Sequence, residues 1–435
     1  MGCGEGILRI VFDHLSLDKP LLALRIVRRQ VTVCPNCGAG GTDEAGFAVV
    51  AVAIPKGFRT DFSWGENAKE EAEFITTGSS SVAESDQAPL FDLLNTNSAL
   101  AFSGKGRVFR VNDRAGQLYS GAIGSANTPG TVNLQHQWID SRFQSGDPHV
   151  AFQASSPIEN VALIAPKTTD IVRFAPSHTP HGMLLDPTQG ALNRLRGPAL
   201  KAAYYSAAFI VRSVAAGLLD IDPEELDIST VRRVERPIGH FIGEIVISDH
   251  LANGAGFAGQ VHSRWQELLD SIIHAVAGDT SFAGELISPA HRKSCDSACP
   301  DCLKHYRNMS YHGLLDWRLG LALLQVFNDS SYACGLNGDF SGPELTGWHH
   351  FAEELRDAFC AAFPCTPVDF GPLPGFKVGN LQVIVAHPLW DSSKPIGELA
   401  TAIATVGADS QLNLRFLDTF NMQRRMSWTY QALRG

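Results

Sequence analysis

Three cysteines within eight residues constrain this chain more than any other feature. Cys295, Cys299 and Cys302 have the spacing C-x3-C-x2-C, which places three soft sulfur ligands in one short turn. A tetrahedral Zn²⁺ ion takes such ligands, and two thiolates separated by two residues can share one ion. The alternative is that these cysteines are small hydrophobic residues of a core. Their density, among Asp, Ser, Lys and Arg, favours zinc.

A fourth ligand would close the site. The nearby candidates are His291, His305, His312 and Cys334. We expect His312, because it follows Cys302 by ten positions and opens an apolar helix onto which the turn could fold back. A catalytic zinc would keep a water in the fourth position and would need a nearby base. The segment has no HExxH or HxE pattern, so we expect a structural, closed site.

A second cysteine pair lies near the start of the chain. Cys34 and Cys37 enclose Pro-Asn and are followed by glycine, which is half of a zinc ribbon in shape. A ribbon needs a second pair of ligands, and only Cys3 lies near. Cys34 and Cys37 are therefore candidate ligands of a second metal ion, and the alternative is a tight turn without metal.

The charge of the chain bears on nucleic-acid binding. The 435 residues carry a formal net charge of −10. A free-standing nucleic-acid binder is usually basic, because phosphate neutralisation supplies most of its affinity. We therefore expect any DNA contact to use a local basic patch within a larger assembly. The candidates are the four basic residues that flank the cysteine cluster, namely Arg292, Lys293, Lys304 and Arg307.

Composition indicates a cytoplasmic protein without a membrane partner. The chain is 44% hydrophobic and 18% charged, as globular proteins are. Nine cysteines, an odd number with clustered spacing, suit metal binding in a reducing compartment better than a disulfide framework. Charged residues interrupt every early apolar run, unlike in a secretory leader. We also expect no apolar segment long enough to span a bilayer.

Residue patterning predicts a multidomain α/β protein that mixes helices with a mixed sheet. Residues 1–150 form a β-rich region with the half-ribbon turn, 151–335 a helix-rich zinc-binding domain, and 336–435 a small α/β region. The zinc-binding domain should contain a long apolar helix at 198–219, a strand at 244–248 and a helix at 314–327. An amphipathic helix before the cysteines is predicted by apolar residues at helical spacing: Trp265, Leu268, Leu269, Ile272, Ile273 and Val276.

A glycine-rich loop follows the strand at 244–248. Gly254, Gly256 and Gly259 formally satisfy G-x-G-x-x-G between a strand and a helix. A dinucleotide site would also need an acidic residue after a second strand, and no such strand is evident. Close packing of strand and helix is therefore favoured over phosphate binding.

Motifs of common enzymes are missing from the sequence. Gly104-Lys105 is followed by Gly106 and Arg107, so no P-loop is present, and no helicase motif or G-x-S-x-G elbow occurs. His387 follows a predicted strand and could form a site with Asp391, although packing in the core is the favoured role. The sequence therefore favours a non-enzymatic protein.

Several segments together carry a family resemblance over roughly residues 155–330. They are 168–172 (TTDIV), 219–221 (LDI), 246–249 (VISD), 254–257 (GAGF), and the cysteine cluster with Leu303, Asn308, His312 and Leu315-Asp316. The segment resembles the zinc-binding domain that closes MrfA-type DEAD/DEAH-box helicases. It also resembles DrmB, the helicase-less subunit of the DISARM anti-phage system.

The resemblance implies ligands and partners. Cys295, Cys299 and Cys302 fall on the zinc ligands of the family. The chain departs from the family at the fourth ligand, where another Cys is usual and His312 is the substitute, and at Asn253, where the loop has glycine. The family implies an accessory protein that joins a helicase or ATPase subunit and helps it to hold DNA. Because no helicase core is present, the role of DrmB is the closer analogy.

Three functional hypotheses follow. The first is a non-enzymatic, zinc-stabilised partner of a DNA helicase or translocase, in bacterial defence against phage. The second is a metal-dependent hydrolase or nuclease that uses the zinc, or Asp249, His250 and His387, on nucleic acid. The third is the C-terminal piece of a split helicase whose motor is encoded separately, which the unmatched Cys34 and Cys37 support.

Overall fold

The computed structural model describes residues 51–53, 80–83, 89–112, 119–127, 134–140, 151–187, 197–237, 239–406 and 413–434. Cys34 and Cys37 lie outside these residues. The described residues separate into two compact units. Unit 1 contains 51–53, 80–83, 107–112, 119–127, 134–140 and 151–168, and unit 2 contains the others. The structure confirms the predicted α/β fold class, with two sheets among the described residues.

The described part of unit 1 consists of β-strands. They are β1 (Ala51–Ala53), β2 (Ser80–Ala83), β5 (Tyr119–Asn127), β6 (Leu134–Asp140), the end of β4 (Ser98–Asn112) and the beginning of β7 (Ala151–Pro176). Strand β5 pairs antiparallel with both β6 and β7, whereas β1 pairs parallel with β7. Strands β4 and β7 are long and continue into unit 2.

The sheet of unit 2 is built around β10 (Phe241–Asp249), which contains the predicted strand at 244–248. It pairs antiparallel with β7, with β8 (Leu226–Ile228) and with β9 (Arg232–Glu235). Residues 242–249 are all buried, so both faces of this strand are covered. Strand β4, next to β7, also pairs with the short β3 (Phe91–Asp92).

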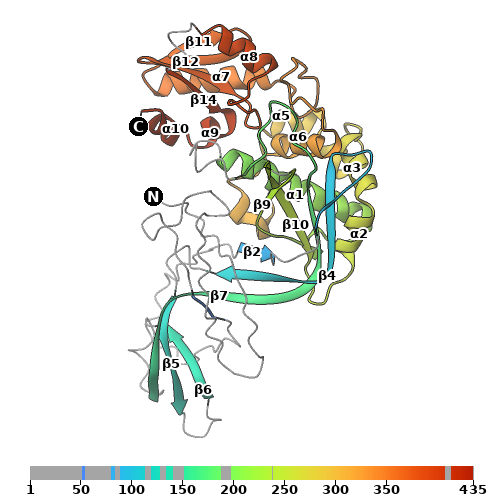
Figure 1. The fold of residues 1–435 in the computed structure, drawn as a ribbon, viewed down its shortest axis with the longest axis vertical. Coiled ribbons are helices and arrows are strands. Elements are labelled where there is room, and N and C mark those ends of the chain that lie inside the picture. The colour runs from blue at the N-terminus through green and yellow to red at the C-terminus, as the bar shows by residue number, and fades with distance from the viewer. Residues whose placement is uncertain are drawn as a thin grey trace. The chain divides into compact units, whose positions relative to one another are not determined.

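Helix α1 (Gly197–Leu219) is the central helix of unit 2 and packs on β10 (Figure 1). A Cβ atom on Gly243 of β10 would lie 2.4 Å from the ring of Tyr204, so only glycine permits this approach. The Tyr204 hydroxyl accepts from the N–H of Gly243 and donates to the Leu185 carbonyl, both at 2.8 Å. The expectation that no apolar segment is long enough to span a bilayer is wrong for α1, which by length and composition could cross a membrane; 83% of its apolar stretch is buried inside the protein.

Short helices follow the sheet. They are α2 (Phe257–Ser263), α3 (Trp265–Ile273), α4 (Phe282–Leu286), α5 (Pro289–Ser294), the 3-10 helix η5 (Tyr306–Tyr311) and α6 (Trp317–Asn328). The predicted amphipathic face is confirmed, because Trp265, Leu268, Leu269 and Ile272 are buried. The prediction is wrong at its end: α3 stops at Ile273, and Val276 is 68% exposed.

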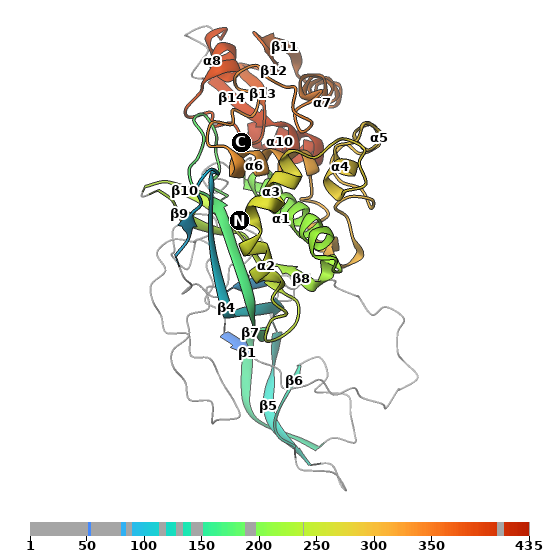
Figure 2. The ribbon, with the colours of Figure 1, turned by 90° about the vertical axis from the view of Figure 1, so that its right-hand side faces the viewer.

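The last hundred residues of unit 2 contain a second, four-stranded sheet. Its order is β11 (Thr366–Phe370), β12 (Leu373–Val378), β13 (Leu381–Ala386) and β14 (Leu414–Asp418), and β13 and β14 are parallel. Helices α7 (Trp348–Ala362) and α8 (Gly397–Ala404) lie on opposite sides of this sheet (Figure 2). The chain ends in α9 (Thr419–Arg424) and α10 (Met426–Arg434). These elements cluster with the cysteine-rich region in one unit, and the three-part domain division stays a prediction.

Candidate metal centre

Helix α5 brings a histidine next to the first cysteine. Ser288 caps this helix, because its hydroxyl accepts from the N–H of His291 at 3.2 Å, and Pro289 occupies the first turn. Cys295 is the residue that caps the other end, and its N–H donates to the His291 carbonyl at 2.8 Å. Residues four apart in a helix share one face. The side chains of His291 and Cys295 therefore point to the same side.

A tight turn brings the other two cysteines to the same place. The N–H groups of Cys302 and Lys304 donate to the Cys299 carbonyl at 3.2 and 3.0 Å. The N–H of Cys299 donates to the sulfur of Cys302 at 3.1 Å. These bonds fix the Cys299–Cys302 turn with its sulfur atoms facing Cys295.

The four side chains bring their ligand atoms close together. The sulfur of Cys302 lies 3.9 Å from that of Cys295 and 3.5 Å from that of Cys299. His291 Nε2 lies 3.5 Å from the Cys299 sulfur, and all four ligand atoms are within 4.8 Å of one another. With zinc–sulfur bonds of about 2.3 Å, a tetrahedral site separates its sulfur atoms by about 3.8 Å. The His-Cys3 cluster could therefore hold a zinc-like metal ion.

The tautomer of His291 fits the same role. Its Nδ1 lies 2.7 Å from the carbonyl of Leu286, to which Nδ1–H donates. This bond leaves the lone pair on Nε2, the atom that faces the cysteines. Metal-binding histidines commonly hold their other ring nitrogen in this way.

The three thiols share a proton network. A hydrogen bond from the Cys295 thiol is the main cause that lowers the pKa of Cys302 to about 5. The same bond raises the pKa of Cys295, and burial raises the pKa of Cys299. One thiolate is thus already stabilised in the cluster, and metal binding would release the protons of the others.

The structure puts His291 in the fourth place that the sequence analysis gives to His312. The Nε2 atom of His312 lies 3.0 Å from the His305 carbonyl and 2.9 Å from Asn308 Oδ1. Both are acceptors, so Nε2 carries a hydrogen and has no lone pair for a metal. The spacing of His291 and Cys295, four residues apart after the helix-start signal Ser288-Pro289, was a sequence signal for the group that the structure brings together.

Residues 313–317 tie this centre to the rest of unit 2. Trp317 donates its backbone N–H to the Ser297 carbonyl at 2.8 Å and its indole N–H to the Cys295 carbonyl at 3.2 Å. The N–H of Asp316 donates to the Ser206 hydroxyl on α1 at 2.7 Å. Arg424 of α9 donates to the Leu315 carbonyl at 2.9 Å. One short segment therefore holds the cysteine loop, α1 and α9.

The loop after Cys302 displays an aromatic side chain. Tyr306 is 87% exposed and Met309 is 52% exposed. The loop itself is fixed, because His305 and Asn308 form a capping box and the Asn308 amide donates to the Leu303 carbonyl at 2.8 Å. Tyr306 is not among the residues predicted from the sequence, although an aromatic residue between Lys304 and Arg307 is a readable signal of contact with a nucleic-acid base.

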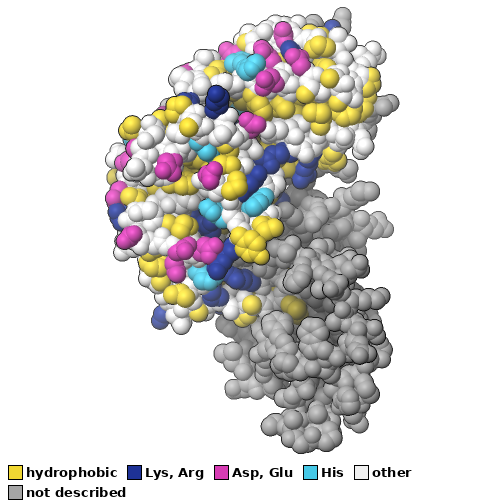
Figure 3. All heavy atoms as spheres, turned by 180° about the vertical axis from the view of Figure 1, so that it is seen from behind, with side chains coloured by type: hydrophobic (Ala, Val, Ile, Leu, Met, Phe, Trp, Pro, Cys, Tyr) yellow, Lys and Arg dark blue, Asp and Glu magenta, His cyan; other side chains and the backbone are white. Residues whose placement is uncertain are grey.

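The four basic residues predicted to contact nucleic acid differ in exposure. Lys293 and Arg307 are exposed, whereas Arg292 and Lys304 are half-buried. Arg307 Nη1 forms an ion pair with Glu224 at 2.8 Å, yet 65% of its side chain stays exposed. Basic and acidic side chains are mixed on the face shown in Figure 3, where no broad basic area appears. The candidate contact surface is therefore small.

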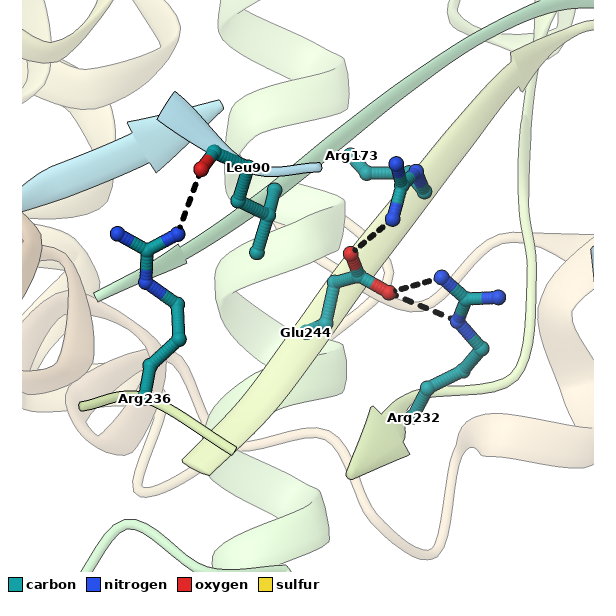
Figure 4. Close-up of polar contacts among 5 residues, drawn as sticks. All are labelled: Leu90, Arg173, Arg232, Arg236 and Glu244. Atoms are coloured by element: carbon teal, nitrogen blue, oxygen red, sulfur yellow. Dashed lines mark hydrogen bonds and ion pairs between the residues drawn. The ribbon is translucent and has the colours of Figure 1, made fainter. Parts of the chain in front are cut away.

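Arginines in and around strand β9 form ion pairs and hydrogen bonds within the protein. Glu244 of β10 is fully buried between Arg173 and Arg232, with Arg173 Nη1 at 2.8 Å and Arg232 Nε at 2.7 Å from its carboxylate (Figure 4). Arg236 donates to the Leu90 carbonyl at 2.8 Å. A buried carboxylate needs such partners to offset its desolvation. These arginines are therefore engaged by the fold.

The glycine loop is already filled by a carboxylate of the chain. Buried Asp249, at the end of β10, accepts from the N–H groups of Ala255 and Gly256 at 2.6 and 2.7 Å. It also accepts from Phe257 at 3.2 Å and Ala258 at 2.7 Å, at the start of α2. Asp249 thus takes the donors that a phosphate would need, and close strand–helix packing accounts for the loop.

His250 and His387 of the hydrolase hypothesis, and Asp391, which was considered together with His387, have structural partners. His250 Nδ1 lies 3.2 Å from Asp227. His387 is buried, its Nδ1 accepts from the Leu389 N–H at 3.2 Å, and burial lowers its pKa to about 3. Asp391 accepts from the N–H of Ser393 at 2.9 Å. Among the described residues, the His291 cluster is the group arranged to hold a metal ion.

The chain is similar to a solved helicase structure. No family model and no curated protein matches the chain significantly. The solved structure is described as the crystal structure of the DUF1998 helicase MrfA bound to DNA. The match has 10% sequence identity and a TM-score of 0.28, and it covers 57% of this chain and 26% of that one. The chain therefore spans about a quarter of the length of that helicase.

Proposed function

We propose that this chain is a non-enzymatic, zinc-stabilised accessory subunit that joins a cytoplasmic DNA helicase and helps it to engage DNA. The observation that carries the proposal is the closed donor set of His291, Cys295, Cys299 and Cys302. Four protein ligands leave no position for a reactive water, which is the arrangement of structural zinc. The role of the ion is then to hold a loop in shape.

The loop that the ion would hold supports the DNA part of the proposal. Tyr306 follows Cys302 after three residues and projects into solvent. An exposed ring is suited to stacking on a base of a single strand, and each stack is worth about 1–3 kcal/mol. Lys304 and Arg307 on either side can contact phosphates, which position a strand without reading its sequence.

The charge of the chain and its lack of a P-loop support the proposal that it acts with a partner protein. The formal net charge of −10 disfavours strong binding to DNA by the chain alone. The sequence has no P-loop to drive translocation. The residue-level resemblance to the domain of MrfA-type helicases, and to DrmB of DISARM, extends the proposal to an ATPase partner in anti-phage defence.

Binding to labelled single-stranded DNA tests the contact. Zinc-loaded protein should bind with an affinity that Tyr306→Ala lowers by roughly tenfold to a hundredfold, the value of one base stack. The control Tyr306→Phe keeps the ring and should bind like the wild type. Equal affinity of all three proteins, measured by fluorescence anisotropy, would exclude the stacking role.

Co-purification tests the partner. The tagged chain, expressed with its native neighbouring genes, should recover a large ATPase. Recovery of the chain alone in repeated preparations would argue against an accessory role.

A further inference from the structure

Two cysteines outside the metal centre lie in contact. Cys360 is in the last turn of α7, and Cys365 directly precedes β11. Their sulfur atoms are 3.0 Å apart, and both are free thiols. A disulfide bond is about 2.0 Å long, so the two sulfur atoms need to approach by only about 1 Å to bond.

The turn between these cysteines is held by its neighbours. The Phe363 N–H donates to the Phe359 carbonyl at 3.0 Å, and the Cys365 N–H donates to the Phe363 carbonyl at 2.8 Å. The Phe363 ring stacks on Tyr430 of α10, with ring centres 4.3 Å apart. The two thiols therefore meet because the folded turn keeps them together.

Small reagents can reach one of the two thiols. Cys365 and Pro364 line an open surface groove with Thr366, Val368, Lys377 and Gly379. Cys334, in contrast, is buried beside His387. The cysteines of the metal centre would be protected by a bound ion.

We propose that Cys360 and Cys365 are a modification site that a peroxide converts into an intrachain disulfide. One thiolate attacks a peroxide oxygen, which gives a sulfenic acid and one water. The sulfur of the second cysteine then displaces the hydroxyl of the sulfenic acid, and this oxygen leaves as a second water. Two thiols and one hydrogen peroxide thus give one disulfide and two waters.

The environment of the pair sets the conditions for this reaction. Burial raises the pKa of Cys360 to about 12 and raises the pKa of Cys365. Because the thiolate is the reactive form, oxidation should be slow at pH 7 and should accelerate as the pH rises toward 9. The disulfide would join the end of α7 to β11 and so hold Phe363 against Tyr430.

Peptide mapping of the whole zinc-loaded chain tests the proposal. After treatment with hydrogen peroxide, trypsin releases residues 357–377 as one peptide that contains both cysteines. We expect this peptide to lose two hydrogens and to resist alkylation until it is reduced. In Cys360→Ser, the same treatment should give no such loss.

The exposed Met309 serves as an internal gauge of oxidant delivery. If Met309 becomes oxidised while both cysteines of the 357–377 peptide remain alkylatable at pH 9, the proposal is overturned. Pairing of either cysteine with a third one would overturn it too. Neither readout depends on DNA or on a helicase, so the result is independent of the proposed function.

Discussion

Two loops of unit 2 have sequence motifs of binding sites, but only one keeps its ligand atoms available. In the glycine loop, the backbone donors converge on the buried carboxylate of Asp249. In the cysteine loop, three sulfur atoms and His291 Nε2 converge on a common point. The difference shows that a sequence motif can bind a ligand only where side chains of the protein do not already occupy its donor or acceptor groups.

Removal of one thiolate from the cysteine loop should have the largest effect. Structural zinc contributes an apparent binding free energy of about 10–16 kcal/mol, which is also folding free energy. We expect Cys302→Ala to abolish stoichiometric zinc binding and to unfold the loop, as shown by elemental analysis and thermal melting. Cys365→Ser is the control and should keep its zinc. A folded Cys302→Ala protein with full zinc content would refute the closed site.

His387 is a third candidate site residue, and its side chain is buried in the core. Its native pKa of about 3 lies below the unfolded value, so the unfolded chain binds a proton first as the pH falls. Stability should therefore fall between pH 6.5 and 3, by up to about 5 kcal/mol. Urea unfolding at several pH values should show a flatter profile for His387→Gln.

The filled glycine loop can be emptied by mutation. Asp249→Ala leaves four N–H groups without their acceptor and should cost about 3 kcal/mol of unfolding free energy. Asp249→Asn keeps one acceptor oxygen and should cost less. If ATP or inorganic phosphate stabilised the wild-type protein through this loop in a thermal-shift assay, the interpretation of the loop as structural would fail.

The smallest expected effect is that of His312→Ala, and comparison with His291→Ala shows which histidine binds the metal. His312→Ala removes a hydrogen-bond donor, so it should cost about 1 kcal/mol and leave zinc affinity unchanged. His291→Ala removes a donor of the cluster, and zinc affinity should fall by more than the roughly tenfold to hundredfold that an outer partner is worth. Competition with a chromogenic chelator measures both. The reverse order of effects would restore His312 as the ligand.

Sequence patterns predicted the parts of this fold that depend on local periodicity. The buried face of α3 and the strand β10 followed from apolar spacing, and the three clustered cysteines meet as their spacing indicated. The end of α3 before Val276 did not follow, because helix ends depend on the turn that comes next.

The choice between His291 and His312 depended on long-range information. Both histidines lie within reach of the cysteines along the chain, and only the folded positions of Asn308 and Leu286 decide which ring nitrogen is free. The hydrogen-bond acceptor in the glycine loop could not be predicted for a similar reason. The sequence does not show that the Asp249 carboxylate accepts from the N–H of Ala255. Exposure of Tyr306 likewise appears only after folding.

The segment 313–317 has a mechanical consequence. Arg424 donates to the carbonyls of Gly313 and Leu315, and Trp317 at the other end donates to Cys295, so we expect a change in the cysteine loop to affect the C-terminal helices. Depletion of the ion should therefore be detectable at α9, on the far side of that connection, as faster amide exchange.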